Sequence, residues 1–425
     1  MNSNEIYVSL DIGTSNVRVI IGEMSNGTMN IIGVGKSNSE GIKKGAIVDI
    51  DETVQSIRRA VDQAERMVGL QVKQVIVGVN GNHIQLQPCH GVVAVSSQDR
   101  EIGDEDIARV IDAAQVVSIP PEREVIDVIP KQFIVDGLDE INDPRGMIGV
   151  RLEMEGTIIT GSKTVLHNLY RCVERAGLQV ADMCLQPLAT GSVAVSKDEK
   201  NLGVCLIDIG GGSVTVSIFE QGTLQNSSVV PVGGDHITND IAVGLRTSTE
   251  EAERIKVKHG HAYIDDASVE ERFKIATIGR ADGVECTQEE LAHIIEPRVE
   301  EIFELIYREI LRLGYRDFPS GYVLTGGTVM MPGILELANE LLQGNVRMAM
   351  PDYLGVREPQ YTAGVGLIQF AYKNVKIQGK EVAASVSNAE TSYEPKQKQV
   401  KSSNEIETKP KTKGKMKNLF KVFFE

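Results

Sequence analysis

The sequence predicts an α/β protein made of two duplicated α/β domains, with an inserted α+β subdomain and a polar C-terminal extension. Two observations predict this class: one strand–turn–strand motif occurs twice, and stretches with strand and helix periodicity alternate around each copy. The length of 425 residues agrees with it, because a chain of this size exceeds one ordinary hydrophobic core.

The first half begins with a meander of strands followed by a helix. Strands are expected at residues 6–10, 17–22, 31–35 and 74–79. Between the last two, residues 51–69 carry apolar side chains at helical spacing. Asp51 is the expected N-cap of this helix and Gly69 its C-cap.

The rest of the chain divides into an insert, a second half and a tail. Residues 83–161 change character and interrupt the helix–strand alternation, and the alternation then resumes, with a helix opened by Pro332 near its end. We expect the following domains: 1–82, first half of domain 1; 83–161, inserted subdomain; 162–200, return to domain 1; 201–234 and 314–372, domain 2; 235–313, small subdomain; 373–412, disordered linker; 413–425, amphipathic helix.

The internal repeat is the most informative feature. Residues 10–23 align without gaps on residues 207–220, at an offset of 197. The matching pairs are Asp11/Asp208, Ile12/Ile209, Gly13/Gly210, Val17/Val214, Val19/Val216, Ile21/Ile218 and Glu23/Glu220. The two halves are therefore expected to share one structural plan.

Each copy of the repeat has the chemistry of a phosphate-binding turn. A strand ends in Asp and turns at Gly-rich sequence, where backbone N–H groups can approach an anion closely. The Asp side chains, Asp11 and Asp208, can hold Mg²⁺ or its water shell. Alone, such a motif is more often a plain hairpin; duplicated, and followed by Leu324-Thr-Gly-Gly-Thr328, it predicts two loops that grip one nucleotide.

Composition and motifs exclude several other classes. The net charge of −15 argues against nucleic acid as a partner. Residues 31–37 resemble a P-loop, but Asn30 replaces its first glycine and no helix follows. No dinucleotide fingerprint follows the first strand. The five cysteines are scattered and are expected to be reduced core thiols, and neither a signal peptide nor a membrane span is predicted.

The three glycine motifs together resemble the actin, heat-shock-70 and sugar-kinase superfamily, which closes two related domains over ATP and Mg²⁺. The resemblance implies an actin-like fold around a nucleotide cleft. It implies cofactor-binding roles for Asp11, Gly13, Thr14, Ser15, Asn16, Asp208, Gly210, Gly211, Gly212, Ser213, Gly233, Gly234, Glu253, Lys256, Gly326, Gly327 and Thr328. Gln186 and Asp208 are implied near the attacking water and the metal. For Gln186, Glu253 and Lys256 the alternatives are a helix cap and a surface ion pair.

Within that superfamily, longer stretches resemble the FtsA family of bacterial cell-division proteins. These stretches are residues 39–49, 129–137, 143–153 and 233–242, and the resemblance extends over about 6–372. It implies head-to-tail polymers, recruitment of later division proteins, and binding of the C-terminal peptide of the tubulin-like FtsZ to the small subdomain. Arg298 and Glu301, one helical turn apart, are the expected contacts, with an exposed ion pair as the alternative.

The C-terminal tail has its own pattern. Met416, Leu419, Phe420, Phe423 and Phe424 form one apolar stripe at helical spacing, and Lys415, Lys417 and Lys421 lie around it. From Lys409 onward six lysines oppose one glutamate, so the tail carries +5 and the remaining chain −20. Such a segment is typical of peripheral binding to anionic lipid. The resemblance to the family implies that this lipid is the cytoplasmic face of the plasma membrane at the septum. Docking into a partner groove or onto the chain's own body is the alternative.

Other functions on the same fold are weaker matches. A small-molecule kinase needs a substrate site, and no such motif is found in residues 83–161. A chaperone of the heat-shock-70 type needs a peptide-binding domain, which the polar sequence after Tyr372 cannot form. A pilus or competence assembly protein is the nearest alternative, and the usual lack of this tail in such proteins separates it from the favoured function. We expect at most slow ATP hydrolysis.

Overall fold

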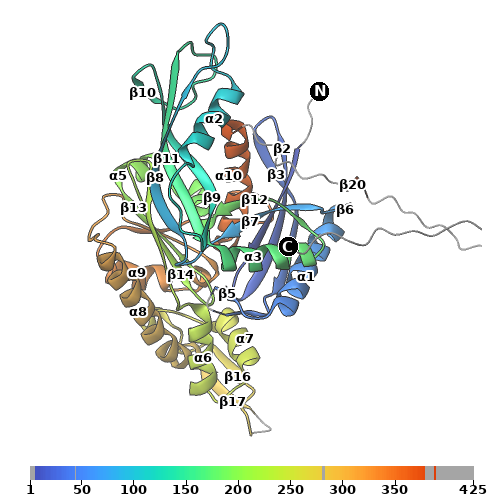
Figure 1. Cartoon of the computed structure of the whole chain (residues 1–425). Helices are drawn as coiled ribbons and strands as arrows, with labels where there is room; N and C mark the ends of the chain where they lie inside the picture. Colours follow the sequence, from blue (N-terminus) through green and yellow to red (C-terminus); the bar gives the residue numbers. More distant parts are fainter. Residues whose placement is uncertain (1–4, 44, 280–282, 379–386, 389–425) are drawn as a thin grey trace, which may run out of the picture. The chain divides into compact units, whose positions relative to one another are not determined.

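The computed structural model describes residues 5–43, 45–279, 283–378 and 387–388. Two five-stranded sheets dominate it (Figure 1). The first consists of β1 (Glu5–Ile12), β2 (Asn16–Ser25), β3 (Thr28–Asn38), β7 (Gln74–Val79) and β12 (Gln179–Leu185). The second consists of β13 (Val204–Ile209), β14 (Val214–Glu220), β15 (Thr223–Val230), β18 (Tyr322–Thr325) and β19 (Val346–Met348).

The two sheets have the same topology. The first runs β3-β2-β1-β7-β12 and the second β15-β14-β13-β18-β19. In each, three antiparallel strands come from one meander, and two strands parallel to the first strand are added through crossovers. The duplication seen in the sequence is therefore a duplication of the whole sheet.

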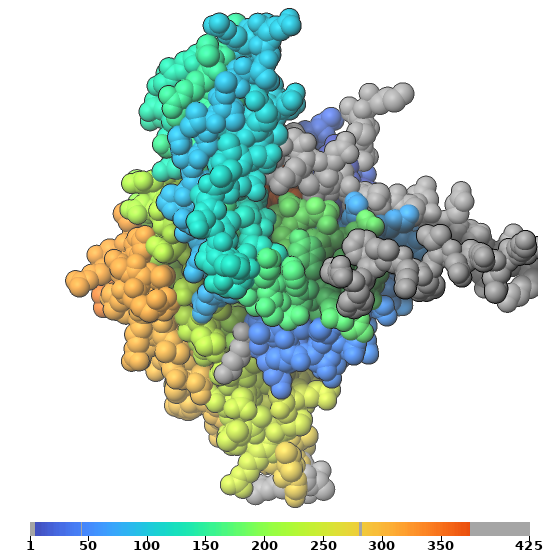
Figure 2. Space-filling view, in the orientation of Figure 1, coloured from blue at the N-terminus to red at the C-terminus, as the bar shows by residue number. Residues whose placement is uncertain are grey.

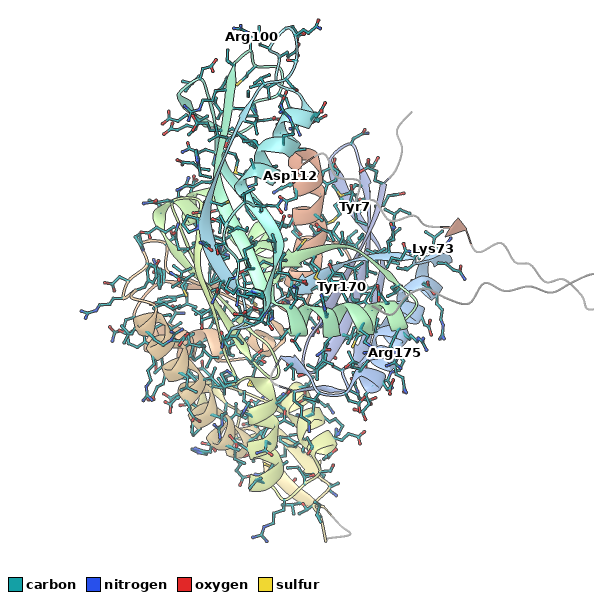
Figure 3. The ribbon with its side chains drawn as sticks, viewed as in Figure 1. Tyr7, Lys73, Arg100, Asp112, Tyr170 and Arg175 are labelled. Carbon is teal, nitrogen blue, oxygen red and sulfur yellow. The ribbon has the colours of Figure 1, made fainter. Side chains whose placement is uncertain are left out.

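Helices cover both faces of the first sheet. Helices α1 (Ile50–Val68) and α3 (Lys163–Arg175) pack on one face, and α4 (Gln186–Ala194) and α10 (Thr362–Gln378) on the other. Arg175, at the end of α3, pairs with Asp51 of α1, and the outer sides of both helices lie on the surface (Figures 2 and 3). Helix α10 approaches α4 so closely that a Cβ on Gly366 would overlap the backbone of Ala189.

The remaining elements complete the two halves. The first half also contains β4 (Ile42–Lys43), β5 (Ala46–Ile47), β6 (Leu70–Gln71) and β20 (Ser387–Asn388). Helix α5 (Lys197–Leu202) packs against β14 of the second sheet. The segment expected as an insert contains β8 (Gln85–Ala94), α2 (Asp104–Ala114), β9 (Arg123–Val135), β10 (Leu138–Ile141) and β11 (Arg151–Ser162). Its four strands form a separate antiparallel sheet, and the apolar side of α2 packs on that sheet.

The second half carries a helical segment between β15 and β18. It contains α6 (Gly234–Gly244), α7 (Thr249–His259), η1 (Ile264–Asp266), β16 (Arg272–Ile275), β17 (Val284–Thr287) and α8 (Gln288–Arg312). After β18 come η2 (Gly327–Met330), α9 (Ile334–Leu341) and η3 (Pro359–Tyr361). Buried Ile241, Ile255, Ile295 and Ile302 join these helices to one core with the second sheet.

Three local expectations were wrong. Asp49, not Asp51, caps α1: its backbone is extended and its side chain accepts a hydrogen bond from Glu52 N at 3.0 Å. Pro332 precedes α9, which begins at Ile334 after Gly333 in the left-handed region. Helix α10 continues to Gln378, so the linker expected from residue 373 begins inside it; Asn374 is buried there and donates to Asp127 of β9.

Candidate functional site

The two copies of the sequence repeat fold into the same hairpin. In the first, Asp11 pairs with Arg18 across β1 and β2; in the second, Asp208 pairs with Thr215 across β13 and β14. The turns close in the same way, since Gly13 N donates to Asn16 O at 3.1 Å and Gly210 N donates to Ser213 O at 3.0 Å. Both turns leave backbone N–H groups at the end of the hairpin.

The two turns face and touch each other. A Cβ added at Gly211 would overlap Ser15 Oγ, and one added at Gly212 would overlap the Thr14 side chain. Ser15 Oγ also donates to the carboxylate of Asp235, the second residue of α6, at 2.9 Å. The glycines of the second turn are thus required by the side chains of the first.

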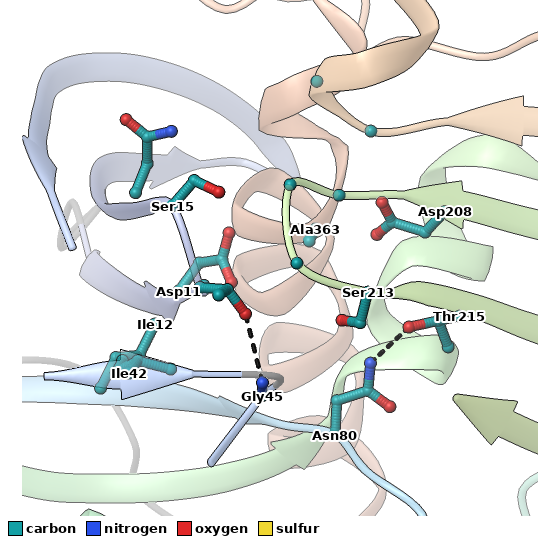
Figure 4. Close-up of a pocket in the computed structure, with 18 of the residues that line it drawn as sticks. Asp11, Ile12, Ser15, Ile42, Gly45, Asn80, Asp208, Ser213, Thr215 and Ala363 are labelled. Carbon is teal, nitrogen blue, oxygen red and sulfur yellow. Dashed lines mark hydrogen bonds between the residues drawn. The ribbon is translucent and has the colours of Figure 1, made fainter. Parts of the chain in front are cut away.

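A cavity of about 660 Å³ lies around these turns. Asp11 and Ser15 line one side of it, and Asp208 and Ser213 line the other (Figure 4). Every residue predicted to hold the cofactor lines the cavity except Gly233, and Gln186 lines it too. Gly233 lies behind the second turn, where a Cβ would meet the carbonyl oxygens of Gly210 and Gly211 at 2.5 Å.

The third glycine motif is fixed against the second turn. Gly326 has φ +98°, and a Cβ there would meet Ile209 O at 2.5 Å. Thr328 Oγ1 donates to Gly210 O at 2.9 Å. The three glycine motifs, far apart in the sequence, therefore form one continuous backbone surface in the cavity.

Lys256 and Glu253 lie on α7 at the edge of the cavity. Lys256 Nζ donates to Gly234 O at 3.0 Å and to Thr238 Oγ1 at 2.7 Å, and it lies 2.6 Å from Glu253 Oε2. Only 10% of the Lys256 side chain is exposed, against 49% for Glu253. The ion pair between Lys256 and Glu253, which was the alternative to a cofactor role, is present. Its lysine, however, lies mostly buried in the cavity wall.

The equivalent carboxylates Asp11 and Asp208 have different surroundings. Asp11 accepts a hydrogen bond from Gln186 Nε2 at 3.0 Å and lies 3.7 Å from Arg18. Burial raises the pKa of Asp11, and Arg18 and Gln186 oppose that rise. Burial, together with the negative charge of Asp11, raises the pKa of Asp208 to about 6. A divalent cation beside the two carboxylates would lower both pKa values.

The donors in this cavity suit a nucleotide with bound Mg²⁺. The glycine turns have no side chain between their backbone and the facing turn, and the carboxylates of buried Asp11 and half-buried Asp208 supply oxygen ligands. Arg18 Nε is buried without a hydrogen-bond partner, as expected of a group that binds an anion. No cluster of three or more metal-ligating side chains occurs among the residues that the structure describes, so Mg²⁺ would depend on phosphate oxygens and water for its other ligands.

Several cavity residues were missed by the sequence analysis. They are Arg18, Lys36, Asn80, Thr215 and Gln360. Asn80 Nδ2 donates to Thr215 Oγ1 at 2.6 Å and so ties the end of β7 to the second sheet (Figure 4). Only the strand register shows that Arg18 and Lys36 lie opposite each other on β2 and β3. Motif reading offered no signal for Gln360, which lies outside every glycine motif.

Arg298 and Glu301, the expected partner contacts, lie on α8. Arg298 pairs with Glu301 and also with Asp240 of α6, whose Oδ1 accepts from Arg298 Nη2 at 3.1 Å. The arginine side chain is 26% exposed and Glu301 is 51% exposed. The ion pair expected as the alternative is present, and it leaves both side chains accessible at the surface.

The predicted membrane residues fall in a part of the chain that is not described. Met416, Leu419, Phe420, Phe423 and Phe424, and the lysines around them, lie beyond residue 388. Within the described ranges, no helix is both long enough and apolar enough to cross a bilayer.

Comparison with protein families gives two matches. Residues 205–366 match the family model described as cell division protein FtsA, and residues 81–160 match the SHS2 domain inserted in FtsA. The chain is 58% identical to the cell division protein FtsA of Bacillus subtilis (strain 168), with 100% of both chains covered. It is 33% identical to that of Escherichia coli (strain K12), covering 90% of this chain and 95% of the other.

Solved structures of lower similarity share the fold. MreB 5 of Spiroplasma citri bound to AMPPNP has a TM-score of 0.53 at 15% identity, over 88% of this chain and 97% of that one. The PilM–PilN type IV pilus biogenesis complex has a TM-score of 0.57 at 14% identity, over 85% and 97%. The MamK double helical filament has a TM-score of 0.51 at 12% identity, over 87% and 99%. These similarities confirm the actin-like fold class.

Proposed function

This chain belongs to the FtsA family of cell-division proteins, and from that we propose that it binds ATP and Mg²⁺ between its two repeats, polymerises, and tethers FtsZ to the membrane. The observation that carries the nucleotide proposal is that the two glycine turns meet and line the same cavity. Two facing turns can hold one phosphate chain from both sides.

We propose that different residues of the cavity bind the phosphates, the adenosine and the metal. Backbone N–H groups of the turns at Gly13 and Gly210 would hold phosphate oxygens, and Gly326 to Thr328 would lie against the adenosine. Asp208 would orient the metal or its water, while Gln186 holds Asp11 in place through the 3.0 Å bond. When bound, Mg²⁺ would neutralise phosphate charge. We propose slow hydrolysis at most, with Gln186 and Asp208 as the residues near the attacking water.

The first experiment is calorimetric titration with Mg-ATP. Wild-type protein should bind, and Asp208→Ala should bind much more weakly, because removal of the carboxylate removes the metal contact. Glu23→Ala is a control on β2 outside the cavity lining. Equal affinity in wild type and Asp208→Ala would exclude this site assignment.

The proposed tether depends on the tail helix of residues 413–425. Its apolar stripe would enter the interface of the plasma membrane on the cytoplasmic side, and its lysines would contact anionic lipid. One tail binds weakly, and a polymer would combine many tails through avidity.

Sedimentation with anionic liposomes in the presence of ATP tests the tether. The intact chain should sediment with the vesicles; a truncation at Thr412 and the variant Phe420→Glu should not. Equal sedimentation of all three would refute the membrane role of the tail.

The proposed FtsZ site lies on the small subdomain around Arg298 and Glu301. A peptide with a carboxylate could compete with Asp240 and Glu301 for the guanidinium. Arg298→Glu should therefore abolish binding of the FtsZ C-terminal peptide, whereas Arg308→Glu on the same helix should not. If Arg298→Glu keeps wild-type peptide affinity, the contact lies elsewhere.

A further inference from the structure

Two cationic side chains stand side by side on one wall of the cavity. Arg18 of β2 and Lys36 of β3 are direct cross-strand partners, and both line the cavity. Like charges directly opposite each other destabilise a sheet. Such a pair persists in a fold when something else compensates for it, and in a cavity the compensating group can be a ligand.

Gln360 is the side chain to which both cations donate. Lys36 Nζ donates to Gln360 Oε1 at 3.0 Å, and Arg18 Nη2 donates to the same oxygen at 3.3 Å. This oxygen belongs to a neutral amide. Arg18 is also 3.7 Å from Asp11, but its Nε is buried without a partner and only 13% of the side chain is exposed. Two cations therefore share one neutral acceptor.

The electrostatic effect on Lys36 points the same way. Burial and the nearby Arg18 lower the pKa of Lys36, although Glu358 and Glu253 act in the opposite direction. The charged form of Lys36 is thus less favoured in the protein than it is in water. An anion bound at this wall would favour the charged form of Lys36 and raise its pKa.

The position of the pair identifies the anion. A Cβ on Gly327 would lie 3.7 Å from Gln360 Cβ and 3.9 Å from Arg18 Nη2, so the pair lies beside the third glycine motif. On its other side is Asp11, at the first turn. The wall therefore lies between the segment expected at the adenosine and the turn expected at the phosphates.

We propose that Lys36, together with Arg18, binds the phosphate chain of the nucleotide, and that Gln360 holds the two cations in position until the phosphates arrive. This rests on the proposed function, because it assigns further ligands to the same nucleotide. Neither cation belongs to a glycine motif. Their positive charge would contribute to nucleotide affinity through the phosphates, and not through the base or the ribose.

The test is calorimetric titration of the full chain with Mg-ATP, Mg-ADP and adenosine. Lys36→Gln should weaken Mg-ATP and Mg-ADP by about tenfold or more, because charge-assisted hydrogen bonds are lost, and should leave adenosine unchanged. Lys36→Arg should retain most of the affinity. Lys43→Gln is the matched control: Lys43 is an exposed lysine of β4 outside the cavity lining, and its loss should change nothing.

A stability measurement separates ligand binding from a structural role. The thermal midpoint of nucleotide-free Lys36→Gln should equal or exceed that of wild type, since a like-charge contact is removed, while its stabilisation by Mg-ATP should be smaller. A lower midpoint without nucleotide, or equal losses for adenosine and Mg-ATP, would assign Lys36 a structural role and overturn the proposal. Unchanged Mg-ATP affinity would also overturn it. A wild type that fails to bind Mg-ATP would instead remove the proposed function itself.

Discussion

The first and second copies of the hairpin share one backbone but differ in their side chains. In the first, Asp11 has Arg18 across the strand pair and Gln186 as a hydrogen-bond donor. In the second, Asp208 has Thr215 in place of the arginine, and its raised pKa reflects burial next to the charge of Asp11. The two copies share the geometry of the turn and differ in the side chains that surround their carboxylates.

The two turns also differ in bulk. Thr14 and Ser15 stand where the second copy has Gly211 and Gly212, and each turn leaves room for the other only because of that difference. The comparison teaches that the two halves complement each other and are not interchangeable. The following predictions test that asymmetry, from the largest expected effect to the smallest.

The largest effect is expected from bulk in the second turn. Gly212→Val should abolish Mg-ATP binding and lower the stability of the protein by about 1–3 kcal/mol, because the new side chain overlaps Thr14. Thr14→Gly alone should have a smaller effect on stability. The double variant should recover part of the lost stability, measured by chemical denaturation. If the stability changes of the two single variants add up to that of the double variant, the side chains of the two turns are not in steric contact.

The next effect concerns the two carboxylates. In nucleotide-free protein at pH 8, Asp208→Asn should raise stability by up to about 3 kcal/mol, since a shift from 3.8 to about 6 corresponds to that energy. Asp11→Asn should raise the stability less, because this substitution also removes the attraction between Asp11 and Arg18. Both variants should bind Mg-ATP more weakly than wild type. Equal stability changes in the two variants would contradict the asymmetry between the halves.

The same carboxylate predicts a pH dependence. Because the pKa of Asp208 is higher in the folded protein, its contribution to stability is present below pH 3.8 and is lost as the pH rises through about 6. The stability difference between Asp208→Asn and wild type should therefore grow between pH 4 and pH 7. A difference that stays constant over this range would show that Asp208 titrates normally.

The smallest effect is expected at the bridge between the first turn and α6. Ser15→Ala removes the 2.9 Å hydrogen bond to Asp235 and should weaken Mg-ATP binding only a few-fold, since one such bond contributes about 1 kcal/mol. Asp235→Asn retains an acceptor oxygen and should have a still smaller effect. A loss as large as that of Gly212→Val would mean that the bridge, and not the fit of the turns, holds the cavity together.

Some parts of the site could be predicted because their signal is local. A glycine turn between two strands needs only a few neighbouring residues, and its duplication made Asp11 and Asp208 recognisable as equivalents. The family and the fold class, both confirmed, followed from these motifs and the stretches around them. The roles assigned to the cavity residues stay predictions that the binding experiments test.

Other parts could not be predicted because they depend on packing between distant segments. Whether Lys256 is a surface residue or part of the cavity wall depends on how α7 packs beside Gly234. Gly233 was counted with the cavity, yet the second turn covers it. The helix cap at Asp49 was misplaced because two aspartates stand near the helix start and only backbone conformation distinguishes them.

The sequence by itself determined the duplicated plan, the three glycine motifs and the membership of the family, because each is written in short runs of residues. Only the tertiary structure decided that Arg18 and Lys36 meet at Gln360, more than three hundred residues away in the chain. The physical reason is that strand register and helix packing set the distances between side chains. No pattern within a single segment contains that information.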